Sequence, residues 1–168
     1  MKASLLLRSL PVFVFLLLPV SVSAQNAGEM DAMLAADTVS AAKAARFILG
    51  AADLLDPGLS GPDAEEAACN LAILNGWIGA HGSESVTLKQ TAFLVMKAFD
   101  LKGGIMYSLF GSPRYAYREM IYRKLITGHA DNTMILTGFR LLQILDETIS
   151  YVGESVFGSA DAEIIGSQ

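Results

Sequence analysis

The sequence predicts an all-α fold built from stacked helix-loop-helix repeats, with about two units and a closing helix. Apolar residues recur at helical spacing along most of the chain, and no stretch shows the sustained alternation of apolar and polar residues that is typical of a strand. An apolar residue followed by a hydroxyl residue also recurs at nearly constant intervals. We expect this helical repeat domain to occupy residues 36–152.

Residues 1–24 have the composition of a signal peptide. Lys2 and Arg8 supply positive charge beside an apolar run, and Val22-Ser23-Ala24 supplies the small residues at which a signal peptidase cuts. We therefore expect cleavage after Ala24 and export to the periplasm or cell envelope. An uncleaved membrane anchor is the alternative, but the run is short for a spanning helix and prolines interrupt it.

The mature chain is predicted to be acidic. The full sequence has 12 basic and 17 acidic residues, and cleavage removes two basic ones, which leaves a net charge of −7. This charge argues against nucleic acid or an anionic membrane as the main partner, because neither binds an acidic surface that lacks a strong basic patch. The remaining 144 residues suffice for one domain with a hydrophobic core.

Cys69 is the only cysteine, so the sequence offers no internal disulfide. We interpret this residue as a small buried apolar side chain. A reactive thiol would need cationic neighbours, whereas the charges nearest in sequence are those of Glu65 and Glu66.

Residues 25–35 are expected to be an N-terminal linker. The first helix is predicted over residues 39–55 and ends at Asp56-Pro57-Gly58. The second is predicted over residues 63–77, with acidic residues in its first turn and Asn75-Gly76 as its stop. The apolar stripe of the first helix consists of Ala44, Phe47, Ile48, Ala51, Leu54 and Leu55.

Three more helices follow in the prediction. One covers residues 86–101 and is closed by Gly103-Gly104. The next begins at Ser112-Pro113, with serine as the cap and proline at the first helical position, and stops at Gly128. The last covers residues 136–152, and residues 153–168 are small and polar, which predicts a flexible C-terminal tail.

The helix starts repeat. Val39-Ser40, Val86-Thr87 and Leu136-Thr137 are each an apolar residue followed by a hydroxyl residue, at spacings of 47 and 50 residues. The hydroxyl stands at the N-cap, where it can accept from free backbone amides, and Thr87 with Gln90 forms the pattern of a capping box.

The ends of the second helices repeat as well. Residues 75–83 align with residues 123–131 at an offset of 48, and their apolar, glycine and histidine positions largely correspond. Because caps and helix ends recur at nearly one period, we infer an internal repeat of a helix-loop-helix unit.

Three motifs follow one another in the order VTLKQ, RKLITGHADNTM and LTGFR, and RYAYRE precedes the second. This order resembles the S-layer homology domain, which alternates helix starts such as ITRAE with helix ends such as KGIITGYPDGTF and commonly has an aromatic entry such as WAYEAI. The resemblance covers roughly residues 36–152. It implies stacked helix pairs that bind cell-wall polysaccharide or peptidoglycan, or anchor the chain at the envelope, without catalysis.

The resemblance also indicates which functional positions are kept. In the family, the arginine of ITRAE and residues around the GYPDG turn help to bind the polymer. The arginine position is taken here by Ala41, Leu88 and Gly138. The turn is kept better, because Gly128 and Asp131 match its glycine and acidic positions, while His129 stands where an aromatic residue is usual.

A helical wheel of residues 113–126 gives two apolar sides. The core side is predicted to hold Tyr117, Ile121 and Leu125, and the second side Tyr115, Tyr122 and Ile126 with Arg118 between them; Arg114 adds positive charge nearby. The second side could stack a sugar face on tyrosine and pair a carboxylate with arginine. The alternative is plain packing against the neighbouring repeat, with Arg118 paired to Glu119 or another acid.

The sequence contains no pattern typical of an enzyme. His81 and His129 lack metal-ligand spacing, no nucleophile elbow is present, and Gly103-Gly104 is not followed by the lysine and hydroxyl of a phosphate loop. We therefore expect no catalytic residues, no metal and no cofactor.

Two kinds of partner remain for a binding protein. The first is cell-wall polysaccharide or peptidoglycan. The alternative function is a protein-binding adaptor or structural component of a periplasmic or envelope complex, which would bind another envelope protein through the tyrosine and arginine side or through the Met-bearing helix FLVMKAF. Self-association is possible because the family usually has three repeats, and nucleic acid is not expected.

Overall fold

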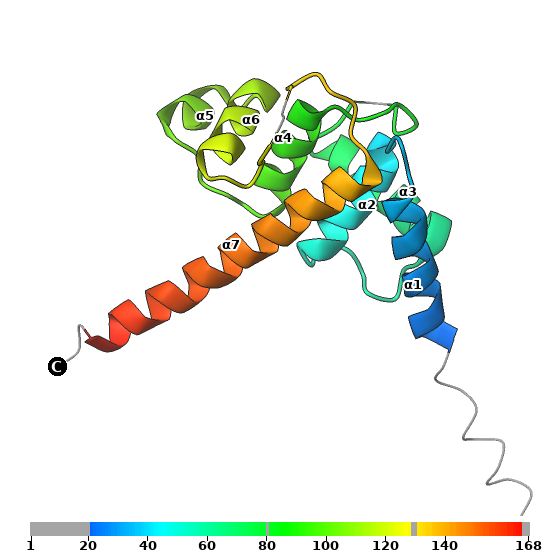
Figure 1. Cartoon of the computed structure of the whole chain (residues 1–168), viewed down its shortest axis with the longest axis horizontal. Coiled ribbons are helices and arrows are strands. Elements are labelled where there is room, and N and C mark those ends of the chain that lie inside the picture. The colour runs from blue at the N-terminus through cyan, green and yellow to red at the C-terminus, as the bar shows by residue number, and fades with distance from the viewer. Residues whose placement is uncertain (1–20, 80, 129–130, 166–168) are drawn as a thin grey trace, which may run out of the picture. The chain divides into compact units, whose positions relative to one another are not determined.

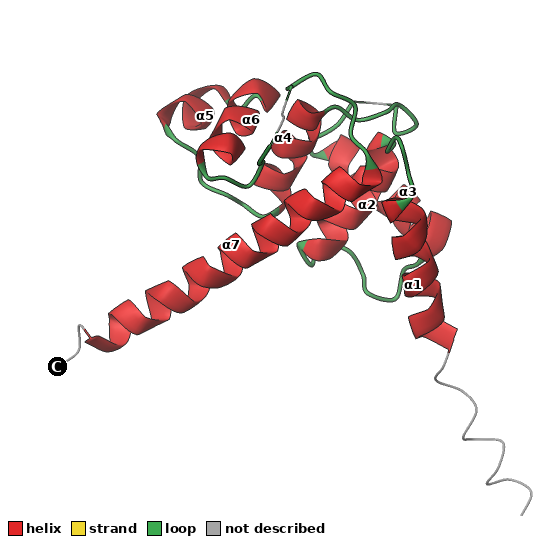
Figure 2. Ribbon diagram, viewed as in Figure 1, coloured by secondary structure: helices red, strands yellow, loops and turns green. Residues whose placement is uncertain are grey.

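The computed structural model describes residues 21–79, 81–128 and 131–165, and throughout these residues the regular structure is helical (Figure 2). The chain divides into two compact units, residues 1–35 and residues 36–168. The first unit contains α1 (Ser21–Leu34). The second contains α2 (Ala41–Ala51), α3 (Gly61–Leu74), α4 (Leu88–Ala98), α5 (Ile105–Phe110), α6 (Pro113–Tyr122) and α7 (Gly138–Ile165), as Figure 1 shows.

Two segments predicted to lack regular structure are helical. Most of the expected linker, residues 25–35, belongs to α1, and α7 continues through the expected flexible tail as far as Ile165. The linker is rich in Ala, Met, Glu and Leu, which favour helix. The tail contains no proline, and it extends a helix whose nucleation is already complete. The predicted cleavage after Ala24 falls within α1 and stays a prediction.

The second unit is centred on a closed ring of three backbone hydrogen bonds. The N–H of Val39 donates to the carbonyl of Leu136 at 3.0 Å, the N–H of Leu136 donates to Val86 at 3.0 Å, and the N–H of Val86 donates back to Val39 at 2.9 Å. All three side chains are buried. Buried backbone groups need partners, and in this ring three short segments satisfy one another without forming a sheet.

The helices that follow these three residues are anchored in a second layer of hydrogen bonds. The first amides of a helix have no acceptor within the helix, so they need one outside it. In α2, α4 and α7 the acceptor is the carbonyl of a residue that lies two or three positions before another member of the ring. The bonds run from Ala41 to Glu84 at 2.8 Å, from Leu88 to Met134 at 2.9 Å and from Gly138 to Ala36 at 2.8 Å.

The predicted hydroxyl caps are confirmed. Ser40 Oγ accepts from the N–H of Lys43 at 3.2 Å, and Thr137 Oγ1 accepts from the N–H of Arg140 at 3.3 Å. The capping box of α4 is also present, with Thr87 N–H donating to the side-chain oxygen of Gln90 at 2.8 Å. Sequence alone therefore located the starts of three helices.

The core lies between α2, α4 and α7, and it is extended by α3 packing on α2 and α6 packing on α4. Small side chains allow the outer helices to approach closely, because α3 buries only alanines on its inner face. The inner helices supply most of the fully buried large side chains. These include Ile48, Leu49, Leu88, Leu94, Val95, Met96, Leu141 and Ile144.

Several predicted helices end earlier than expected. α2 ends at Ala51, so Leu54 leaves the predicted stripe and is exposed. α6 ends at Tyr122 instead of near Gly128, because Lys124 takes a left-handed backbone with φ of +61° and reverses the chain.

Because of this reversal, the buried and exposed residues of α6 differ from those that the helical wheel predicts. Ile126 lies outside the helix and is buried, whereas Ile121 is exposed. Ala116, Tyr117 and Met120 form the buried face of the helix. Among the described residues, no helix is both long enough and apolar enough to cross a bilayer.

Candidate binding groove

The candidate site lies where α5 and α6 meet. Gly111 ends α5 with a left-handed backbone, φ +49°, and Ser112-Pro113 begins α6 directly afterwards. Proline suits the first helical position because the missing N–H would have no partner there, while glycine accepts the left-handed turn without steric cost. The two helices therefore form a tight hairpin.

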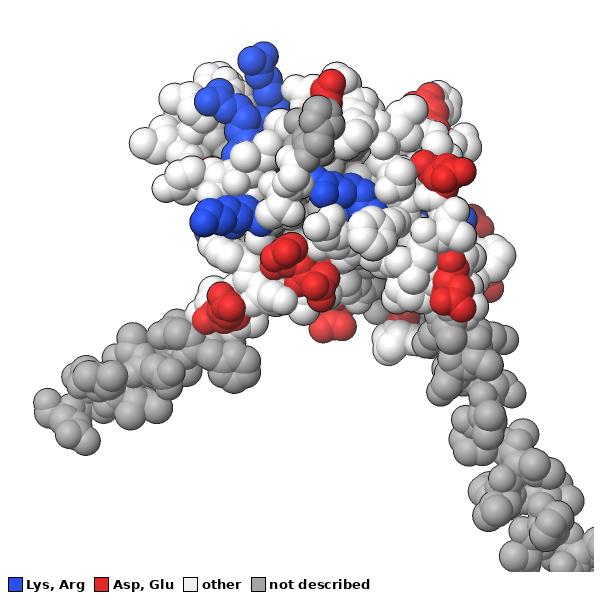
Figure 3. Space-filling view, viewed as in Figure 1, with Lys and Arg blue, Asp and Glu red and all other residues white. Residues whose placement is uncertain are grey.

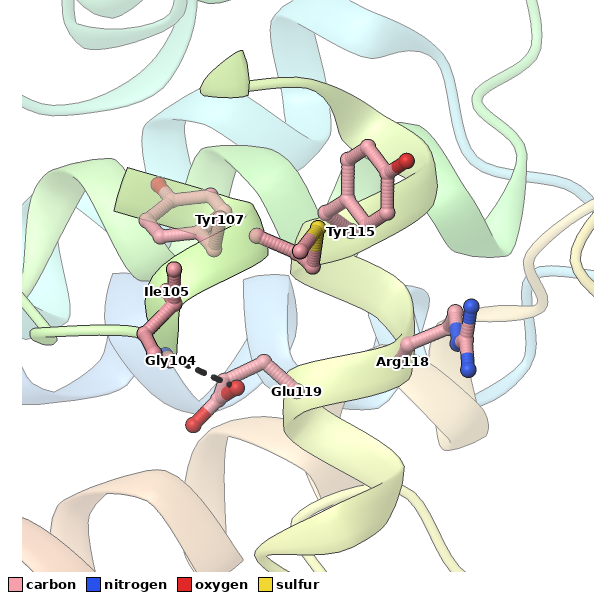
Figure 4. Close-up of a pocket in the computed structure, with 7 residues that line it drawn as sticks. Gly104, Ile105, Tyr107, Tyr115, Arg118 and Glu119 are labelled. Carbon is pink, nitrogen blue, oxygen red and sulfur yellow. Dashed lines mark hydrogen bonds between the residues drawn. The ribbon is translucent and has the colours of Figure 1, made fainter. Parts of the chain in front are cut away.

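A groove of about 430 Å³ runs along this hairpin (Figure 4). Most of its wall is aliphatic or aromatic, and its two charged side chains both come from α6. The lining residues are Gly104, Ile105, Met106, Tyr107, Tyr115, Arg118 and Glu119.

Glu119 fixes the start of α5 against α6. Its Oε2 accepts from the N–H of Gly104 at 3.0 Å, and its Oε1 accepts from Nε of Arg123 at 3.0 Å. Arg123 in turn donates to the carbonyl of Lys102 and to the hydroxyl of Tyr151 on α7. Both oxygens of the Glu119 carboxylate therefore accept hydrogen bonds from within the protein, which gives this side chain a structural role.

Tyr107 closes the inner wall of the groove by packing on Gly103. A Cβ at Gly103 would lie 2.3 Å from Cδ1 of the Tyr107 ring, so only glycine fits there. Lys97 Nζ lies 5.8 Å from the centre of the same ring. Burial, and next the negative charge of Asp100, raise the pKa of Tyr107, so its hydroxyl stays neutral at physiological pH.

Of the predicted site residues, the structure brings Tyr115 and Arg118 together at the groove. The Tyr115 ring stacks on Phe110, with ring centres 5.4 Å apart and planes 24° apart. Arg118 is exposed, and it has no ion pair or cation–π contact among the described residues. The alternative pairing with Glu119 is not formed, because Arg123 occupies that carboxylate. In Figure 4, Arg118 and Glu119 point to opposite sides of α6.

Tyr122 and Arg114 do not line this groove. Tyr122 is 84% exposed, and Arg114 is exposed near the start of α6. The early end of the helix leaves Tyr122 in its last turn with no neighbouring ring among the described residues. Tyr122 thus does not share the groove with Arg118, and the ring that stacks on Tyr115 across the hairpin is Phe110.

The predicted turn residues lie at a different place. Gly128 has φ of +73°, and Asp131 accepts from the N–H and hydroxyl of Thr133, each at 2.9 Å. Arg140 donates to the carbonyl of Thr127 beside this turn. His129 lies outside the described residues.

Arg140 is a residue that sequence reasoning missed. In the S-layer homology motif the arginine directly follows the cap residue. That position is Gly138 here, and Arg140 lies two residues further along the chain. It donates to Gln143 Oε1 at 2.9 Å, whereas its Nε is buried without an acceptor in the described part of the protein. Burial and the charge of Asp131 raise the pKa of neighbouring Tyr117, and Arg140 lowers it. Arg140 thus fixes the turn onto α7.

No match to this chain is found among protein families, curated proteins or solved structures. The assignment of a function therefore depends on the groove itself. The described residues contain no group of three or more His, Cys, Asp or Glu side chains arranged to hold a metal ion.

Proposed function

We propose that this protein is an exported, non-catalytic envelope protein that binds an anionic cell-wall glycan at the groove between α5 and α6. The observation that carries the proposal is the position of Arg118 beside Tyr115 in a largely apolar groove, with no acidic partner among the described residues. A tyrosine ring offers a flat apolar face to a sugar, and a guanidinium offers paired donors to a carboxylate.

The repeat architecture of the S-layer homology type forms part of the proposal. It is supported by the hydrogen-bond ring, whose members Val39, Val86 and Leu136 are the three residues that precede the repeated caps. Equivalent backbone at the helix ends supports it too. Left-handed residues follow α2 and α4 at Asp53 and Asp100, and follow α3 and α6 at Gly76 and Lys124.

Export is proposed on the sequence of residues 1–24 alone. An intact-mass measurement of the native protein tests it. A mass that begins at Gln25 supports export with cleavage, whereas a mass that includes the apolar run indicates a tethered or unprocessed chain.

The glycan site is tested by co-sedimentation of residues 25–168 with purified cell-wall sacculi. We expect Tyr115→Ala and Arg118→Ala each to weaken binding by about tenfold, since each removes one stacking or charge-assisted contact. The α6 helix provides matched controls, because Tyr122 and Arg114 are exposed and do not line the groove. Tyr122→Ala and Arg114→Ala should bind like the wild type.

The same experiment separates glycan binding from its alternatives. Equal loss in all four variants would indicate non-specific attraction to the wall through charge or apolar surface. A wild-type protein that stays in the supernatant would refute wall binding, and the adaptor function would then be tested by capture of one specific envelope protein.

A further inference from the structure

The helix α5 exposes its apolar side chains. None of its six residues is buried. Ile105, Met106, Leu109 and Phe110 are 77%, 53%, 69% and 62% exposed, and their positions in the chain place them on one face of the helix. The opposite face holds Tyr107 against Gly103. The helix thus directs its more apolar face away from the protein, and a contiguous exposed apolar face of this kind is typical of an interaction site.

Positive charge surrounds this apolar helix. Residues 97–124 contain six Lys or Arg and two Asp or Glu, a net charge of +4 within a chain of −5. Both acids are engaged, Asp100 with Lys102 at 2.7 Å and Glu119 with Arg123 at 3.0 Å. Figure 3 shows the basic side chains gathered over the α5 and α6 end of this face. The chain is therefore acidic as a whole but has a local basic patch within residues 97–124.

We propose that α5 docks on an anionic lipid surface. Its four exposed apolar side chains enter the boundary between headgroups and acyl chains, and Arg114 and Arg118 contact lipid phosphates. Apolar insertion and attraction to anionic lipid strengthen each other in interfacial binding, and each Lys or Arg near the surface adds to the attraction. The acidic remainder of the protein is repelled by the same surface, so the charge distribution directs the α5 end toward the bilayer.

A lipid surface fits this patch better than a second copy of the chain. Among the helices, α5 packs on α6, and the apolar face of α5 is exposed on this hairpin. The other large exposed apolar residues are spread over different helices and loops, for example Leu74 on α3, Ile149 on α7 and Leu59 in the loop before α3. A second copy would offer an equivalent patch only at its own α5, and that contact would bring the two sets of arginines together.

Lipid docking and the proposed glycan site share Ile105, Met106 and Arg118, but they can be tested at different residues. Leu109, Phe110 and Arg114 do not line the groove, whereas Tyr115 does. Leu109→Gln and Arg114→Gln therefore report on lipid docking, Tyr115→Ala reports on the glycan site, and each function can fail without the other.

Vesicle flotation tests this proposal with residues 25–168, which retain the entire compact unit 36–168 and lack the apolar leader. The probes are vesicles of phosphatidylcholine alone and of phosphatidylcholine mixed with phosphatidylglycerol. We expect flotation with the mixed vesicles, much weaker flotation with the neutral ones, and loss of binding as salt concentration rises.

Paired variants locate the contact. Leu109→Gln should weaken vesicle binding by about tenfold, because one apolar side chain no longer enters the lipid. The control Leu74→Gln changes a leucine on α3 that is even more exposed, at 84%, and should bind like the wild type. Arg114→Gln should weaken binding by about fivefold, while Lys43→Gln, in the first turn of α2, should not.

Three results would overturn lipid docking. The first is an absence of flotation with anionic vesicles, and the second is equal binding to neutral and anionic ones. The third is equal loss from Leu74→Gln and Leu109→Gln. A concentration-dependent dimer that Leu109→Gln dissociates, in a protein that ignores vesicles, would assign the patch to self-association. Unchanged urea midpoints for the variants ensure that lost binding does not reflect unfolding.

Discussion

Glu119 on α6 and Arg123, the residue that directly follows the helix, form an ion pair at 3.0 Å with each side chain only 17% exposed. Glu119 also accepts a hydrogen bond from the N–H of Gly104, and Arg123 donates one to the carbonyl of Lys102. The loop that leads into α5 is therefore attached to α6 through polar contacts, and the position of the apolar hairpin depends on this pair.

Replacing Glu119 by glutamine should lower the free energy of unfolding by about 1–2 kcal/mol, because it removes a charge-assisted hydrogen bond from a largely buried guanidinium. Urea denaturation at neutral pH measures the loss. The control is Lys102→Ala, which breaks an ion pair whose side chains are 84% and 85% exposed and should change stability by less than about 0.5 kcal/mol. Equal effects from both variants would contradict a special role for Glu119.

Gly103→Ala should disrupt the inner wall of the groove. The new methyl group would lie 2.6 Å from Cβ of Tyr107, so the ring or the loop must move, at a cost of about 1–3 kcal/mol. Gly104→Ala is a milder change, because its Cβ would meet only Glu119 Oε2 at 3.3 Å. Thermal unfolding should rank Gly103→Ala as the less stable variant, and the reverse order would show that Tyr107 adjusts freely.

Lys124→Gly should stabilise the protein by about 0.5–1 kcal/mol. Lys124 takes φ of +61°, a backbone in which a Cβ is strained and glycine is not. Gly76 takes φ of +67° at the corresponding place after α3, and a Cβ added there would meet no atom within 4 Å. Gly76→Ala should therefore destabilise by about 1 kcal/mol through backbone strain alone. Chemical denaturation of both variants checks whether the two changes have opposite signs.

Cys69 should react slowly with alkylating agents. Burial, and next the negative charge of Glu65, raise the pKa of its thiol, so at a given pH less thiolate is present than in a free cysteine. The rate of reaction with iodoacetamide should therefore rise at a higher pH than it does for a small thiol. Glu65→Gln should move this profile part of the way back, and an unchanged profile would leave burial as the sole cause.

Much of the fold could be predicted because capping and helical periodicity are local. Ser40, Thr87 and Thr137 accept or pair as their positions indicate, since a helix start needs an acceptor for its free amides wherever it occurs. The early reversal at Lys124 had no such signal. Lysine does not favour a left-handed backbone, so packing after α6 determines the conformation there.

The candidate groove was predicted only in part, for a related reason. Tyr115 and Arg118 are three residues apart on one helix, so a wheel places them together. The other wall comes from α5, whose sequence IMYSLF is too short to display a helical period and is apolar without being buried. A prediction that treats apolar residues as core residues cannot find a helix that exposes them.

The ring formed by Val39, Val86 and Leu136 also constrains how the chain folds. Two of its members can bond before the third arrives, but the closed arrangement requires a residue 97 positions after the first. Closing such long loops is slow in comparison with helix formation, because chain entropy is lost before the contacts form. The apolar face of the first helix pair therefore stays incomplete until the start of α7 joins the ring, so most of the chain must be present before this unit can close.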